Sequence, residues 1–187
     1  IASKKDNWAG ALTLPRELAM DRNGRLRIHP LPGLKELRKE RVSAANVLLE
    51  NNQRVFGLCD LQKIGLEVIL HADLVGTTAS DFGIVFADTR NSQQITVGFK
   101  GNCGKLYLDI ENAGLGNKGI FWAELLPQQE KLDIRIFLDR SSIEVFADNG
   151  AASMTARIYP RSHKLVPQLF AVDGKLTTSI ELWSLAK

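Results

Sequence analysis

The last third of the sequence holds the feature that most constrains the fold: apolar side chains occupy every second position in three successive runs. The runs cover 132–138, 143–147 and 154–158, and a period of two is typical of strands that bury one face. Arg140-Ser-Ser142 separates the first two runs, and Asp148-Asn-Gly150 separates the second and third. Aspartate, asparagine and glycine tolerate the positive φ angles of tight hairpin turns. We therefore predict three antiparallel strands joined by short turns.

Alternating or apolar runs of strand length recur through the middle and the end of the chain. They lie at 66–71, 82–86, 95–99, 106–110, 166–172 and 176–185. Turns rich in glycine and asparagine separate them, and no long helical pattern intervenes. Short strands at this spacing predict an all-β fold, a two-sheet antiparallel β-sandwich.

The N-terminal part is predicted to be organised differently. Residues 13–28 read as a strand, a turn and a second strand. The spacing of Leu34, Leu37 and Arg41 then predicts a short helix over 32–42, which follows a Pro-Gly pair and would serve as a linker.

Two stretches, in the same order, resemble a known family. The segment from Leu132 to Pro160 closely resembles the C-terminal β-sandwich of the family 32 glycoside hydrolases, which include invertases, levanases, inulinases and sucrose-6-phosphate hydrolases. The stretch Asn7-Trp-Ala-Gly-Ala-Leu-Thr-Leu-Pro-Arg-Glu-Leu18, continued by 21–26 and 30–37, is similar to the segment where that family's catalytic domain ends. The resemblance implies a concanavalin-like or lectin-like sandwich preceded by a short propeller-derived segment.

The resemblance also implies two parts of the chain, with a boundary near residue 40. Residues 1–40 would be the end of the catalytic propeller plus a linker, and 41–187 the C-terminal sandwich. The implied partner is the five-bladed catalytic propeller of the same protein. Because the chain opens within the first of the two resembling stretches, we expect its natural N-terminus to lie further upstream.

The catalytic residues of the resembled family have no counterparts here. That family carries its nucleophile in Asn-Asp-Pro, its transition-state stabiliser in Arg-Asp-Pro and its acid/base in Glu-Cys. The chain contains no Asp-Pro dipeptide, and neither Cys59 nor Cys103 follows a glutamate. We therefore expect an inactive accessory domain, whose parent protein cleaves β-fructofuranosyl bonds in sucrose, sucrose 6-phosphate or fructans without a cofactor.

Two carboxylates in the three-strand segment could be taken for catalytic groups. Asp139 and Glu144 flank a strand break, and retaining glycosidases use two carboxyl groups about 5 Å apart. The structural interpretation is stronger, because Asp139 precedes Arg140 and an Asp–Arg pair at a strand end commonly fixes the loop. Asp139, Arg140 and Glu144 are therefore predicted to be structural.

Two further groups of residues are candidates for binding. Trp8, Arg16 and Glu17 are predicted to lie at the propeller interface, with Arg16 and Glu17 in an ion pair. Tyr107, Asp109 and Trp122 would suit a patch that binds fructan or sucrose, in which rings stack on the sugar and polar groups bond to it.

Apolar residues on the second face of two strands, Phe137 and Phe146, indicate that another domain covers that face. Three roles stay open: a structural domain that packs on the propeller, a fructan-binding module, and a dimerisation domain that uses strand edges.

Composition and charge exclude several other classes of protein. The net charge of +3 is spread along the chain, so nucleic-acid binding is not expected. No apolar run is long enough to cross a bilayer. Two cysteines and three isolated histidines predict neither a disulfide framework nor a metal site. Free thiols favour a cytoplasmic location.

Overall fold

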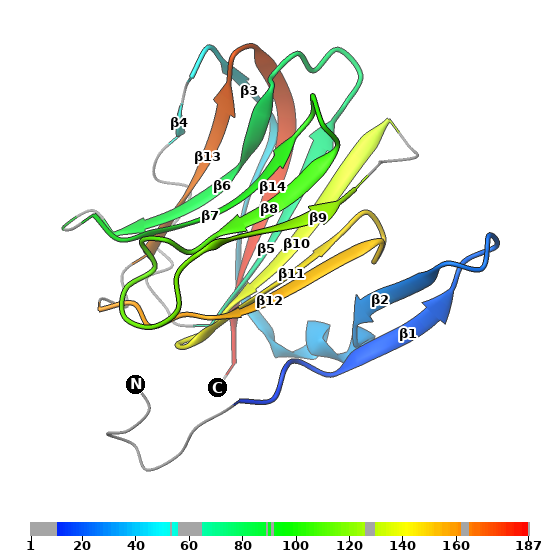
Figure 1. Cartoon of the computed structure of the whole chain (residues 1–187), viewed down its shortest axis with the longest axis vertical. Helices are drawn as coiled ribbons and strands as arrows, with labels where there is room; N and C mark the ends of the chain where they lie inside the picture. Colours follow the sequence, from blue (N-terminus) through cyan, green and yellow to red (C-terminus); the bar gives the residue numbers. More distant parts are fainter. Residues whose placement is uncertain are drawn as a thin grey trace.

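Two six-stranded antiparallel sheets, packed face to face, form the body of the protein in a computed structural model (Figure 1). The structure describes residues 11–52, 54–55, 65–88, 90, 92–125, 130–161 and 165–186. Sheet I has the order β12-β11-β10-β5-β14-β3, and sheet II the order β4-β13-β6-β7-β8-β9. The predicted two-sheet sandwich is confirmed.

The strands of sheet I are β3 (Arg38–Glu50), β5 (Leu66–Asp73), β10 (Lys131–Leu138), β11 (Ser142–Ala147), β12 (Ala152–Arg157) and β14 (Lys175–Leu185). Those of sheet II are β4 (Arg54–Val55), β6 (Asp81–Asp88), β7 (Gln94–Lys100), β8 (Lys105–Asp109), β9 (Ile120–Glu124) and β13 (Leu165–Val172). Ahead of both sheets come β1 (Arg16–Met20), β2 (Leu26–Pro30) and the 3₁₀ helix η2 (Pro32–Leu37).

The core lies between the sheets and follows from the alternation of each strand. Leu70 of β5 and Ile134 of β10 are buried from sheet I, and Ile84 of β6 and Leu108 of β8 are buried from sheet II. These side chains belong to one continuous apolar cluster. Burial of apolar surface at about 25 cal/mol per Å² is the main force that holds the two layers together.

The predicted three-strand segment is present as β10, β11 and β12. β10 pairs with β11 and β11 with β12, both antiparallel. The turn between the last two uses Asp148, Asn149 and Gly150 at φ 47°, 51° and 75°. Asparagine, aspartate and glycine visit this left-handed region at the lowest cost, which explains the sequence of the turn.

The predicted helix over 32–42 is wrong beyond Leu37. Within residues 32–42 only η2 is helical, and the chain enters β3 at Arg38. The backbone is extended rather than helical from Arg38 because β3 pairs along β14, from Leu185↔Arg38 to Lys175↔Glu50. The boundary expected after residue 40 therefore falls inside a continuous strand.

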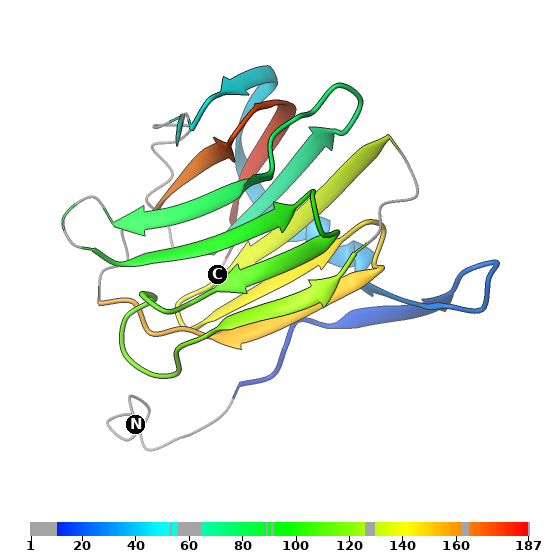
Figure 2. The same ribbon diagram turned by 45° about the horizontal axis from the view of Figure 1, so that its top comes forward.

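β1 and β2 form a separate two-stranded sheet that projects from one end of the sandwich (Figures 1 and 2). Asp21 closes its turn by accepting hydrogen bonds from the backbone amides of Asn23 and Arg25 and from the Arg27 guanidinium. These donors hold the pKa of the Asp21 carboxyl below its usual value. The strand-turn-strand expected over 13–28 is confirmed. No helix in the described part of the chain is long and apolar enough to cross a membrane.

Candidate functional site

Glu144 joins the N-terminal segment to the outer face of sheet I. It lies on β11 opposite the core residues Ile143 and Val145, yet it is only 3% exposed. Its Oε1 accepts a hydrogen bond from the backbone amide of Leu14 at 2.8 Å, and its Oε2 pairs with Nη2 of Arg16 at 2.6 Å. Both carboxylate oxygens are thus occupied. This arrangement fits the predicted structural role of Glu144 rather than a catalytic one.

A small apolar cluster lies next to this ion pair. Phe137 and Phe146 meet edge to face with ring centroids 6.2 Å apart, and Leu34 of η2 closes the cluster. Leu14 and Ile28 pack against it. The second face of β10 and β11 is therefore covered by the N-terminal segment of this chain. The cover expected for these two rings is thus supplied by residues that were predicted to belong to the end of the propeller.

The turn between β11 and β12 receives the hairpin. The Ile28 amide donates to the Gly150 carbonyl at 3.0 Å, and the Arg27 guanidinium donates to the Asp148 carbonyl at 3.2 Å. A Cβ atom at Gly150 would lie 2.7 Å from the Ile28 carbonyl oxygen. Only glycine permits this approach, because φ is +75° and no space remains for a side chain.

A second ion-pair site fixes the start of β3. Glu67 of β5 is fully buried on the outer face of sheet I. Arg38 binds it with two hydrogen bonds of 2.8 and 2.7 Å, and Arg135 adds a third of 2.5 Å. Two guanidinium groups around one carboxylate satisfy its acceptor sites and offset part of its desolvation.

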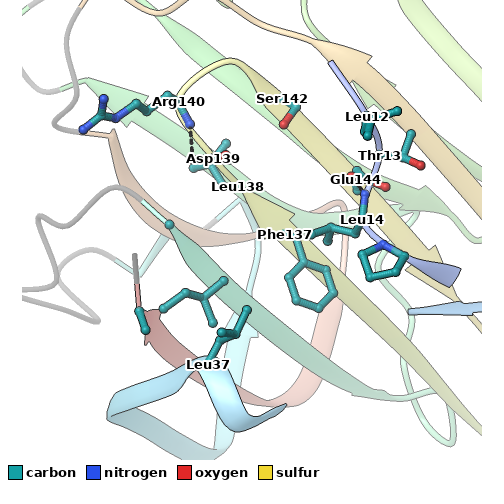
Figure 3. Close-up of a pocket in the computed structure, with 14 residues that line it drawn as sticks. Leu12, Thr13, Leu14, Leu37, Phe137, Leu138, Asp139, Arg140, Ser142 and Glu144 are labelled. Atoms are coloured by element: carbon teal, nitrogen blue, oxygen red, sulfur yellow. Dashed lines mark hydrogen bonds between the residues drawn. The ribbon is translucent and has the colours of Figure 1, made fainter. Parts of the chain in front are cut away.

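A pocket of about 490 Å³ opens beside Glu144, between the N-terminal segment and the C-terminal end of β14 (Figure 3). Its walls are mostly apolar and include Leu14, Leu37, Phe137 and Leu185. Such a pocket suits an apolar side chain better than a charged ligand.

Asp139 and Arg140 lie at the rim of this pocket. The Arg140 backbone amide donates to Asp139 Oδ1 at 2.7 Å, while the Arg140 side chain points away from Phe137 and Glu144 (Figure 3). Asp139 thus contacts its neighbour through the backbone rather than through the guanidinium, and this bond still shapes the loop.

The predicted ion pair between Arg16 and Glu17 is wrong. Neighbouring residues of a strand point to opposite faces, so Arg16 turns inward to Glu144 while Glu17 is exposed on the other side. Trp8, the third residue expected at the propeller interface, lies outside the described residues.

One face of the hairpin is apolar and open. The register pairs Met20 with Leu26 and Leu18 with Ile28, so all four side chains share a face. Ile28 is docked on the sandwich. Leu18 and Met20 are each 65% exposed and Leu26 is 52% exposed. One end of this apolar face therefore packs on the sandwich, and the rest of it extends beyond the sandwich and is exposed.

Tyr107, Asp109 and Trp122, predicted to bind sugar, come together on the outer face of sheet II. Trp122 lies across from Tyr107, with ring centroids 5.2 Å apart. The Tyr107 hydroxyl donates to Asp81, and Asp109 accepts from the Glu111 amide. Tyr107 is 8% exposed and Trp122 48%. The surface therefore offers mainly the indole ring.

Asp81 shows what burial does in this region. Desolvation raises the pKa of the Asp81 carboxyl, against the opposite effects of the Lys100 ammonium and the Tyr107 hydroxyl. Within the described ranges, no three histidine, cysteine, aspartate or glutamate side chains are grouped so that they could hold a metal ion.

The residues that dock the hairpin were missed at the sequence level, apart from Arg16 and Glu144. Leu14 acts through its backbone, and Gly150 and Ile28 meet although they are distant in sequence. A signal was present in β11, where Glu144 and Phe146 share the face opposite the core. A glutamate and a phenylalanine on one outer face indicate that something covers it.

The chain matches a known protein family over most of its length. The sequence model described as "Glycosyl hydrolases family 32 C terminal" matches residues 33–184. The chain therefore belongs to this family of C-terminal domains from family 32 glycosyl hydrolases.

Individual relatives agree with this assignment. The chain is 32% identical to the raffinose invertase of Escherichia coli, covering 99% of this chain and 37% of the relative. It is 31% identical to a sucrose-6-phosphate hydrolase of Zymomonas mobilis, covering 98% and 36%. The chain thus spans little more than a third of the length of these curated relatives.

Among solved structures, the exo-inulinase of Aspergillus awamori superposes with a TM-score of 0.80 at 22% identity, over 94% of this chain and 36% of that one. At this identity the match speaks for the fold alone.

Proposed function

We propose that this chain is the accessory C-terminal domain of a β-fructosidase and that it holds the last hairpin of an adjoining catalytic propeller. The sandwich would stabilise the propeller, and hydrolysis of sucrose, sucrose 6-phosphate or a fructan would take place in the propeller. Family membership and the names of the relatives support the reaction class.

The observation that carries the structural role is the half-docked hairpin. An isolated two-stranded hairpin is marginally stable in water, and this one leaves Leu18 and Met20 exposed. Further strands beside β1 or β2 would complete the sheet, and a neighbouring part of the propeller packed on its face would cover these side chains. Glu144 and Gly150 would then hold the completed sheet against the sandwich.

The catalytic part of the proposal has a direct test. The chain alone is expected to release no fructose from sucrose, sucrose 6-phosphate, inulin or levan. Turnover that scales with protein concentration and survives repurification would contradict the proposal.

The structural part is tested by a chimera in which this chain replaces the matched part of the E. coli raffinose invertase. The unsubstituted chimera should fold and hydrolyse raffinose. Leu18→Lys with Met20→Lys should abolish activity or sharply lower the melting temperature, because the open face of the hairpin could no longer be covered. Glu17→Lys, on the opposite face, is the matched control.

The chimera carrying Leu18→Lys and Met20→Lys also has an outcome that contradicts the role. If it is as active and as stable as the unsubstituted chimera, the hairpin is not packed against the catalytic domain. Circular dichroism of the isolated chain with the same two substitutions should stay unchanged, since both side chains are exposed there.

A second candidate, fructan binding at Tyr107, Asp109 and Trp122, is favoured by the exposed indole, which packs at a tilt against a buried tyrosine. Calorimetry with levan or inulin oligosaccharides, repeated with Trp122→Ala, measures it. No heat at millimolar ligand would count against it.

A further inference from the structure

β9 is the last strand of sheet II, and its backbone is poised to pair again. The Ile110 amide donates to the Gly119 carbonyl, and the Leu125 amide donates to the Gly104 carbonyl. Backbone groups of an antiparallel strand point alternately to its two sides. The amides and carbonyls of Ile120, Trp122 and Glu124 therefore point away from β8, where no described strand pairs with them.

The side chains of β9 are unusual for an edge strand. Ile120, Phe121 and Trp122 follow one another and are 45%, 46% and 48% exposed. Because they are consecutive, the edge is apolar on both faces of the sheet. Edge strands are normally protected by charges, proline or bulges.

β3, one of the two edge strands of sheet I, shows the usual protection. It carries the charged run Arg38-Lys-Glu-Arg41 and register irregularities against β14. These two edge strands, β3 and β9, thus differ in kind, and β9 has the composition of a strand that pairs with another chain.

We propose that the partner is a second copy of this chain, joined by antiparallel pairing of β9 with β9 about a two-fold axis at Phe121. In this register Lys118 lies opposite Glu124 of the second copy, and Ile120 lies opposite Trp122 of the second copy. Lys118 and Glu124 are both exposed and oppositely charged. The symmetry repeats each contact, so the two ends of the pair are closed by opposite charges.

The backbone groups that β9 leaves free lie at the positions that this register would pair. Ile120, Trp122 and Glu124 have their backbone groups on the open side, and the axis at Phe121 matches even-numbered residues only with even-numbered residues. Phe121 meets its own copy at a position without hydrogen bonds, where side chains approach most closely. Pairing would join the two copies of sheet II into one continuous sheet. This inference does not depend on the proposed function.

The test is sedimentation equilibrium or light scattering of the chain from about 1 μM to 1 mM, a range that covers weak homodimers. A monomer–dimer equilibrium is expected. Lys118→Glu and Glu124→Lys should each raise the dissociation constant about tenfold, because each turns two attractive cross-strand pairs into repulsive ones. The double variant should restore the dimer. Lys39→Glu, an exposed charge reversal on β3, should change nothing.

Ile120→Pro tests the backbone pairing itself. It removes an amide that points to the open side, so β8–β9 pairing survives. A folded monomer is expected. A monomer at every concentration for the unsubstituted chain would overturn the proposal, as would a dimer that is unaffected by Lys118→Glu, Glu124→Lys and Ile120→Pro. A monomer whose tryptophan fluorescence responds to levan oligosaccharides, with the response lost in Trp122→Ala, would instead make this surface a sugar site.

Discussion

The sandwich and the β1–β2 hairpin are built from the same kind of strand, but they are held in place by different means. The sandwich has two sheets of six strands around a continuous core, in which side chains such as Leu70 are fully buried. The hairpin has two strands and leaves Leu18 and Met20 65% exposed. It depends on point contacts, chiefly at Glu144 and Gly150. The amount of apolar surface that each region buries decides which one can stand alone.

The largest expected effect comes from the core. Leu70→Ala should lower the free energy of unfolding by about 2–5 kcal/mol, because it leaves a cavity between the sheets. Leu18→Ala removes the same atoms from the exposed hairpin and should change stability by less than about 0.5 kcal/mol. Urea denaturation followed by circular dichroism measures both. Equal losses would mean that the hairpin shares the core's burial in solution.

The ion pair of Glu144 should rank next. Glu144→Gln keeps the shape but leaves Arg16 without its charged partner, which should weaken hairpin docking by about 1–3 kcal/mol. Hydrogen exchange at the Leu14 and Ile28 amides should speed up, while exchange in β5 and β6 stays unchanged. Glu17→Gln is the control. Identical exchange in the two variants would show that Glu144 does not hold the hairpin.

Gly150→Ala should cost about 1–2 kcal/mol from its positive φ and from collision with the Ile28 backbone. Gly24→Ala, in the hairpin turn at φ +73° with open space around its Cβ, carries only the conformational strain. The difference between the two melting temperatures isolates the collision. No difference would place Ile28 further from the turn than described.

The smallest effects are expected from pH, with opposite signs in the two regions. The lowered pKa of Asp21 makes the hairpin turn more stable above about pH 3.8, and this contribution is lost as pH falls through the folded-state pKa. The raised pKa of Asp81 has the opposite effect. Asp81 contributes to the stability of the folded state at low pH, and this contribution is lost as pH rises from about 3.8 through the folded-state pKa. Carboxyl chemical shifts between about pH 2 and 7 measure both values. Shifts of the same sign would contradict the assigned causes.

The sequence predicted the sandwich well, because period-two alternation reports which face of a strand is buried. The turn at Asp148-Asn-Gly150 was predicted for a similar reason, since its residue types tolerate the required φ angles. Three strands were not predicted, and one of them, β4, has only two residues. β3 lacks clean alternation, and its conformation is imposed by pairing with β14. β9 has three successive apolar residues, so its sequence does not show the alternation that predicts a strand.

The site was less accessible to sequence reasoning. Glu144 was predicted to be structural and stays a prediction in that role, while its partner Arg16 was assigned to Glu17, its neighbour in sequence. The contact between Gly150 and Ile28 joins residues far apart in the chain and acts through backbone atoms. Local composition indicates neither the Arg16–Glu144 contact nor the Gly150–Ile28 contact, because both depend on how the hairpin folds back onto sheet I.

Hydrogen–deuterium exchange of the isolated chain, read strand by strand, tests the central claim that the sandwich is self-sufficient and the hairpin is not. Amides of β5, β6 and β10 should exchange only through global unfolding, and their rates should follow the free energy of unfolding in added urea. Amides of β1 and β2 should exchange faster through local opening, with little dependence on urea. Protection of the hairpin equal to that of the core would contradict the account.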